Sequence, residues 1–194
     1  MKATRLLYLI IMMTCFASGV KAQFSSSDRV YCYELMYRME DGIKSMEGLP
    51  NPGIRFFYFK NGYMGWTDAS KQSVIDEGPE YYEKFVKEQF AKNYSQITSS
   101  SPSVSWATIF EFDNSLSSSS TYTYRSKDYS ASTTYSLYGI SPTHKWVSSS
   151  WKTPCYSFSS DRSQVVYWWT DDKIKYYYKL VDASKLRPNI DDIW

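Results

Sequence analysis

The sequence predicts a mainly β fold of the α+β class: an antiparallel sandwich or open barrel with one amphipathic helix, over residues 79–94, packed against it. Three observations lead to this prediction. The chain after residue 22 is rich in Tyr, Trp and Thr, which favour pleated, half-buried surfaces. Short runs of these residues alternate with serine-rich or glycine-containing turn signals. One stretch has the clear periodicity of a helix.

The first 22 residues have the features of a cleavable secretory signal peptide. Lys2 and Arg5 precede an apolar run over residues 6–16, which is too short for a membrane span. Small residues within 20–22 then offer a cleavage site. An uncleaved anchor and a lipoprotein acylated at Cys15 are the alternatives. We therefore expect an exported protein that is periplasmic, surface-bound or extracellular.

Residues 23–194 are expected to form a single β-rich domain without a transmembrane segment. Lys2, Arg5 and Lys21 leave with the leader, so three of the 22 basic residues are lost and 19 face 20 acidic ones. The net charge falls from +2 to −1. A near-neutral chain lacks the basic face that binding to nucleic acid requires, so no nucleic-acid partner is expected.

Cys32 and Cys155 are the two cysteines that remain in the mature chain. In an oxidising compartment they are predicted to form one disulfide between an early and a late strand. Closing so long a loop would stabilise the fold by about 4–5 kcal/mol. Two buried free thiols are the alternative.

A strand, a loop and a hairpin are predicted for the first part of the mature chain. Val30–Arg38 is the strand, and residues 40–53 are a loop rich in Gly, Pro and Asn. Ile54–Lys60 and Tyr63–Thr67 flank Asn61-Gly62, which is the strongest short signal for a two-residue hairpin turn. This turn fixes three cross-strand pairs: Phe59 with Met64, Phe57 with Trp66, and Tyr58 with Gly65, which would leave room for the tyrosine ring.

The helix begins at Pro79, which suits a first helical position, and Glu80 and Glu83 follow in its first turn. Its apolar stripe is expected to pack on the sheet and consists of Tyr82, Phe85, Val86, Phe90 and Tyr94.

The rest of the chain is predicted as strands and turns. The expected strands are 104–112, 121–125, 133–138, 145–151, 155–158, 164–170 and 174–181, followed by an irregular tail over 185–194. In its leader, serine runs and hairpin pattern the chain resembles small uncharacterised secreted β-rich proteins of gut-type bacteria. That resemblance implies export and a β-rich fold, and it transfers no functional residue.

The sequence contains few of the residue patterns that catalytic and metal-binding sites use. His144 is the single histidine, so one chain cannot build a multi-histidine metal site. Neither a phosphate-binding glycine loop nor a dinucleotide fingerprint is present. The pairs Asp171-Asp172 and Asp191-Asp192 lack the spacing of a calcium loop, and we interpret them as a solvated turn and part of the tail. No metal and no cofactor are expected.

The final predicted hairpin carries the residues that most favour a binding role. Centring its turn on residues 171–172 places Val165, Tyr167, Trp169, Ile174, Tyr176 and Tyr178 on one apolar face, interpreted as core. The other face carries Trp168 opposite Lys175, then Tyr177, with Lys179 beyond. Trp168 and Tyr177 are therefore the aromatics expected to lie exposed beside lysines, where they could stack on a sugar or anchor a protein. The alternative is that they cover a second core layer.

We therefore expect a secreted, non-enzymatic binding or structural domain whose partner is a carbohydrate or a cell-surface protein. The alternative is an extracellular hydrolase that resembles glycosidases in using a pair of carboxylates. For that alternative, the carboxylates on or near predicted strands are Glu34, Glu111, Asp113 and Asp161.

Overall fold

The computed structural model describes residues 28–50, 53–97, 109–126, 153–170 and 172–186. Several predicted features lie outside these residues: the signal peptide at 1–22, part of the strand at 104–112, the strands at 133–138 and 145–151, His144, Asp171, and the tail from 187 onward.

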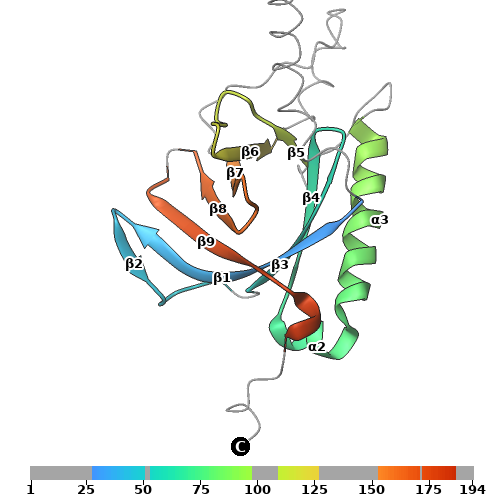
Figure 1. Cartoon of the computed structure of the whole chain (residues 1–194). Coiled ribbons are helices and arrows are strands. Elements are labelled where there is room, and N and C mark those ends of the chain that lie inside the picture. Colours follow the sequence, from blue (N-terminus) through green and yellow to red (C-terminus); the bar gives the residue numbers. More distant parts are fainter. Residues whose placement is uncertain (1–27, 51–52, 98–108, 127–152, 171, 187–194) are drawn as a thin grey trace, which may run out of the picture.

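In the described part of the chain, nine strands form one antiparallel sheet in the order β2-β1-β3-β4-β5-β6-β7-β8-β9 (Figure 1). β1 also pairs with β9, which closes eight of the strands into a barrel and leaves β2 outside it. The prediction of a mainly β, α+β fold is confirmed, with a barrel that is closed rather than open. The elements are β1 (Val30–Glu40), β2 (Ile43–Ser45), β3 (Ile54–Lys60), β4 (Tyr63–Ala69), α2 (Lys71–Glu77), α3 (Pro79–Ile97), β5 (Ile109–Phe112), β6 (Thr121–Ser126), β7 (Pro154–Ser159), β8 (Gln164–Trp169), β9 (Ile174–Val181) and a short 3₁₀ turn, η1 (Ala183–Lys185).

The strand β1 closes the barrel because it pairs with β3 along its first half and with β9 along most of its length. A β-bulge interrupts its register with β9 between Leu35 and Tyr37. Beyond the bulge, Tyr37 lies opposite Tyr177 and Arg38 lies opposite Tyr176. Residues directly opposite each other point to the same face of a sheet. The bulge therefore decides that Tyr37 points outward and Arg38 points into the barrel.

The β3–β4 hairpin has the predicted turn and register. Asn61 and Gly62 both adopt positive φ angles, of 52° and 79°, as a two-residue turn of this kind requires. The three predicted pairs are all present. The space beside Gly65, however, is taken by Phe90 of α3, because a Cβ atom there would lie 3.0 Å from its ring. Tyr58 in turn packs edge-on against Phe90, with 5.1 Å between ring centroids.

Two elements were not predicted. The loop at 40–53 contains β2, which folds back on β1 through Asp41 and Gly42, both with positive φ. α2 begins after Ser70, whose hydroxyl accepts a hydrogen bond from the Ser73 backbone N–H, and Val74 is its one buried residue. Such short elements bury too little apolar surface to leave a periodic pattern. The predicted helix is present as α3 and runs three residues further, to Ile97.

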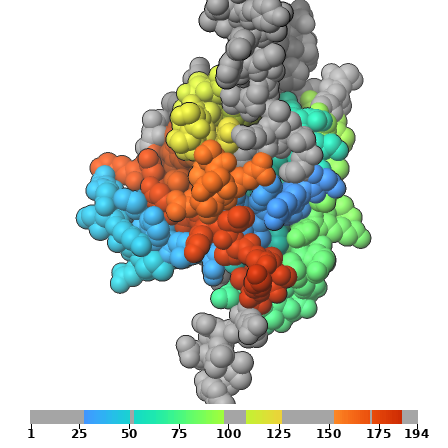
Figure 2. All heavy atoms as spheres, in the orientation of Figure 1, coloured from blue at the N-terminus to red at the C-terminus, as the bar shows by residue number. Residues whose placement is uncertain are grey.

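The described residues form two apolar clusters, one inside the barrel and one outside it. The outer cluster lies between α2, α3 and the outward faces of β1, β3, β4 and β5. Figures 1 and 2 show the helices on one side of the barrel and the β1–β2 hairpin on the other. The inner cluster is mostly aromatic and consists of Tyr31, Tyr33, Leu35, Phe57, Phe59, Met64, Phe110, Tyr122, Tyr124, Tyr156, Phe158, Val165 and Tyr178.

Candidate functional site

The final hairpin has the predicted register and division into two faces. Trp168 pairs with Lys175, and Val166 pairs with Tyr177. On the opposite face Val165 and Tyr178 are buried in the barrel interior. The sequence therefore assigned inward and outward positions of β8 and β9 correctly.

On the outward face, Trp168 and Tyr177 are half-buried, whereas Lys175 and Lys179 are exposed. Tyr177 stacks on Tyr37 of β1, with ring centroids 4.8 Å apart and planes 13° apart. We call Trp168, Tyr177 and Tyr37 the outer aromatic row. Their binding of a ligand remains a prediction.

The barrel interior contains a charged group that the sequence analysis missed. Arg55 on β3 is 8% exposed and points inward, in phase with Phe57 and Phe59. Its cross-strand neighbour on β4 is Asp68, and Arg55 Nε donates to Asp68 Oδ1 over 2.6 Å. Arg55 Nη1 also donates to the hydroxyl of Tyr156 on β7, over 2.6 Å. The sequence did contain a sign of this group: Arg55 is a charged residue at a position that the alternation along the strand assigns to the same face as Phe57 and Phe59.

Aromatic rings surround the Arg55 guanidinium. Its central carbon lies 4.6 Å from the ring centroid of Trp66, 4.9 Å from that of Tyr167 and 5.2 Å from that of Tyr178. At such distances a guanidinium is attracted to the negative face of a ring. Because β3, β4, β7, β8 and β9 all supply side chains here, the closed barrel is what assembles the cluster.

Three further residues lie at the same end of the barrel. Arg38 lies beside the inward-facing Tyr176, which in turn pairs with Tyr167. Trp169 is on the same side of β8 as Tyr167, packs edge-on against it and is 38% exposed, because β8 ends there. We call this set the Arg55 end of the barrel: Arg38, Arg55, Trp66, Asp68, Tyr156, Tyr167, Trp169, Tyr176 and Tyr178.

Three buried polar atoms at the Arg55 end have no hydrogen-bond partner in the described structure: Arg38 Nε, Trp66 Nε1 and the Tyr178 hydroxyl. Buried polar groups in folded proteins are nearly always paired. Solvent reaches this end, since the Asp68 side chain is 23% exposed. The Arg55 end is therefore both accessible and short of acceptors.

Burial is the largest single influence on the pKa values in this cluster. It raises the pKa of Asp68 despite the opposing effect of Arg55. For Arg55, burial lowers the pKa, but Tyr156, Tyr178 and Asp68 together outweigh it and the guanidinium stays charged. Burial also raises the pKa of Tyr156 well above its ordinary value, so this hydroxyl keeps its proton. The cluster thus holds the Arg55 guanidinium, paired with Asp68, among neutral rings.

The opposite end of the barrel is crossed by the turn between β7 and β8. Arg162 in this turn has a φ of 63°, its carbonyl accepts a hydrogen bond from the Tyr33 hydroxyl over 2.9 Å, and its guanidinium donates to the Tyr31 hydroxyl. The turn is thereby tied to β1 across that end of the barrel.

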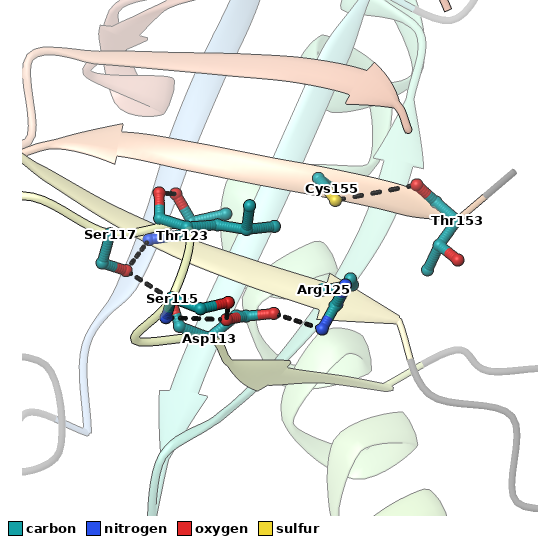
Figure 3. Close-up of polar contacts among 8 residues, drawn as sticks. Asp113, Ser115, Ser117, Thr123, Arg125, Thr153 and Cys155 are labelled. Carbon is teal, nitrogen blue, oxygen red and sulfur yellow. Dashed lines mark hydrogen bonds and ion pairs between the residues drawn. The ribbon is translucent and has the colours of Figure 1, made fainter. Parts of the chain in front are cut away.

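The predicted disulfide between Cys32 and Cys155 is wrong, because both are free thiols. Cys32 lies in the cluster beneath the helices. Cys155 is on β7, on the outward face, and its Sγ contacts the Thr153 carbonyl at 3.6 Å (Figure 3). The two strands are separated by other strands around the barrel. Burial raises the pKa of each thiol to about 12.

Three of the carboxylates considered for a hydrolase have structural partners, and Glu34 pairs with Lys71 over 3.9 Å. Asp113 pairs with Arg125 over 2.6 Å and also accepts hydrogen bonds from Ser115, as Figure 3 shows. Asp161 accepts bonds from Ser159 and Ser163, which lower its pKa to about 2. The contacts of Asp113 and Asp161 organise turns. A general acid, by contrast, needs a pKa raised toward neutrality.

The comparisons with known proteins found no match: no family model, no curated protein and no solved structure is similar to this chain. Of the described helices, α2 and α3, neither combines the length and apolar character needed to cross a membrane. Within the described residues, no three His, Cys, Asp or Glu side chains gather so as to hold a metal ion.

Proposed function

We propose that this protein is an exported, non-enzymatic binding domain and that its ligand occupies the Arg55 end of the barrel. Export is the expectation drawn from the leader. The observation that carries the proposal is the set of unpaired buried polar atoms on Arg38, Trp66 and Tyr178, beside a rim that solvent reaches. A bound ligand would give these groups the partners that buried polar atoms normally have.

The charges at this end also favour binding over a purely structural role. A buried ion pair such as Arg55 and Asp68 is seldom better for stability than apolar residues of similar volume. Here it lies in an interior whose other side chains are mostly aromatic. A closed barrel of eight strands can hold a small ligand at its end while side chains fill the middle.

Trp169 is the residue we expect to contact the ligand at the rim. It is 38% exposed, and Tyr167 beneath it holds its ring edge-on at 6.5 Å. An exposed tryptophan on a rigid strand supplies a large contact area at little entropic cost. Its neighbour Trp168 points to the outside of the same strand, so the two residues form a matched pair for experiment.

The test is a fluorescence and thermal-shift screen of the purified protein against small organic molecules and soluble glycans. A ligand should raise the melting temperature. Trp169→Ala should weaken its binding by about 2 kcal/mol, as for an anchoring aromatic, whereas Trp168→Ala should leave the affinity unchanged. A screen without any ligand, or a ligand lost in Trp168→Ala and kept in Trp169→Ala, would contradict the proposal.

The second candidate is the site predicted from the sequence, in which a glycan or cell-surface protein binds the outward face through Trp168, Tyr177, Lys175 and Lys179. It is favoured by the row of half-buried rings that Tyr37 extends across a third strand, with exposed lysines beside it. The stack of Tyr177 on Tyr37 occupies one face of each ring, so Trp168 would have to make the main contact. The same pair of tryptophan variants separates this candidate from the first.

A further inference from the structure

We infer that the ligand of the Arg55 end is an organic anion with a planar apolar body, and that Arg38 receives its negative charge. This inference rests on the proposed function, because it names the ligand class for the same site.

Among Arg38, Arg55 and Asp68, one positive charge has no counter-charge. Arg55 is paired with Asp68 in a two-point contact, through Nε to Oδ1 and Nη2 to Oδ2. Arg38 forms no ion pair in the described part of the chain, and its Nε atom is buried without a partner. A guanidinium stays charged at any physiological pH. An anion bound beside Arg38 would therefore supply the counter-charge that this guanidinium lacks.

The unpaired atoms need a hydrogen-bond acceptor as their partner. Arginine Nε and tryptophan Nε1 can only donate hydrogen bonds, and the Tyr178 hydroxyl can donate as well. A carboxylate, sulfonate or phosphate oxygen accepts from such groups, and a guanidinium can bind it through two parallel bonds. A ligand that offers only donors would leave Arg38 and Trp66 unsatisfied.

The loop after β2 lies against Arg38. Gly48 has a φ of 64°, and a Cβ atom at that position would lie 3.5 Å from Arg38 Nη1, which is an ordinary van der Waals contact. Another residue at this position would be strained by its backbone conformation. The contact helps to place the Arg38 guanidinium at the Arg55 end.

The surroundings specify the rest of the ligand. Trp66, Tyr167 and Tyr176 are partly buried at this end, and Trp169 is 38% exposed. Flat apolar bodies stack on such rings. A small inorganic anion would satisfy the donors but would make none of these contacts. The combination of donors and rings therefore favours an anion carried on an aromatic or similarly planar body.

The test compares two fluorescent probes with the same aromatic body. 1-Anilinonaphthalene-8-sulfonate carries an anionic group, and N-phenyl-1-naphthylamine is its neutral counterpart. We expect the sulfonate to bind the folded protein saturably and about tenfold more tightly than the neutral probe, the gain expected of a charged hydrogen bond. Added salt should weaken the sulfonate more than the neutral probe.

Two variants and a control assign the effect to Arg38. Arg38→Gln should lower affinity for the sulfonate about tenfold and leave the neutral probe unchanged, and Arg38→Lys should recover part of the loss because the charge returns without the planar fork. Arg29→Gln is the matched control, because Arg29 is exposed and contacts Tyr31 at the other end of the barrel. Circular dichroism checks the fold of each variant.

The outcomes separate this inference from the proposed function. Equal binding of both probes, lost in Trp169→Ala and insensitive to Arg38→Gln, would overturn the anionic ligand and leave the binding site standing. Failure of both probes to bind the folded protein would overturn the inference and count against the site itself. Loss of sulfonate binding in Arg29→Gln rather than in Arg38→Gln would overturn the role of Arg38.

Discussion

Arg55 is a charged side chain among aromatic rings, and Asp68 is what makes its burial tolerable. Asp68→Asn would leave the guanidinium buried without a counter-charge, at a cost of about 3 kcal/mol. The double variant Arg55→Met, Asp68→Leu should recover most of that stability. Urea unfolding of the three proteins checks the stability. A double variant as unstable as the single one would show that the pair is a structural requirement.

The two cysteines behave as small buried side chains. Because burial raises the pKa of Cys32 and Cys155 to about 12, neither is ionised at neutral pH. Both should resist a thiol reagent in the native protein and react with it in denaturant without prior reduction. A reducing agent should leave the melting temperature unchanged. If the two cysteines reacted in denaturant only after a reductant was added, the result would support the predicted disulfide and contradict the free thiols.

Arg55 and the cysteines also show how far single residues could be assigned from the sequence. The alternation on β3 placed Arg55 on an aromatic face, but only the closed barrel brings Tyr156, Tyr167 and Tyr178 to it. Cysteine count and predicted compartment argued for a disulfide, yet the distance around the barrel decided against it. Contacts between residues far apart in the sequence were the part that pattern alone could not supply.

At the scale of elements, the β3–β4 hairpin and α3 depend on each other through Gly65 and Phe90. Gly65→Ala would place a Cβ atom 3.0 Å from Phe90 Cδ2 and 3.2 Å from its Cβ. We expect a loss of about 1–3 kcal/mol from this overpacking, measured by chemical denaturation. Gly53→Ala is the control, since nothing lies within 4 Å of a Cβ there. Equal stability of the two variants would mean that α3 does not pack against β4 in this way.

Elements with strong local signals were predicted well. Asn61-Gly62 gave the hairpin and its register, and Pro79 gave the start of α3. Local period-2 alternation assigned the faces of β8 and β9, which is how Trp168 and Tyr177 were placed. β2 and α2 were missed because each is short and contributes little to either core. The bulge after Leu35 was also missed, and it is what points Arg38 into the barrel.

For the whole molecule, an interior built from tyrosines implies sensitivity to alkali. Burial raises the pKa of Tyr156, Tyr33 and Tyr178 above the ordinary value of 10.0. Above that pH the unfolded chain releases phenolic protons that the folded chain keeps, so the free energy of unfolding falls as the pH rises further. The tyrosinate absorbance of these buried phenols and the circular dichroism should therefore change together in one transition. Stepwise titration of these phenols with the fold intact would contradict a closed, packed interior.

The sequence predicted either a sandwich or an open barrel, and it did not predict that the barrel closes. Closure depends on the pairing of β1 with β9, the first and last strands described, for which the sequence carries no local sign. Closure is also what creates the candidate site. The function therefore had to be proposed from the assembled Arg55 end and could not be taken from Trp168 and Tyr177 alone.

The most direct measurement is a two-dimensional NMR spectrum of the tryptophan indole N–H groups, recorded during titration with 1-anilinonaphthalene-8-sulfonate. If the ligand enters the Arg55 end, the Trp66 and Trp169 resonances shift on binding while the Trp168 resonance stays in place, and Arg38→Gln suppresses the shifts. Movement of the Trp168 resonance with Trp66 unchanged would contradict this account and place the ligand on the outer aromatic row.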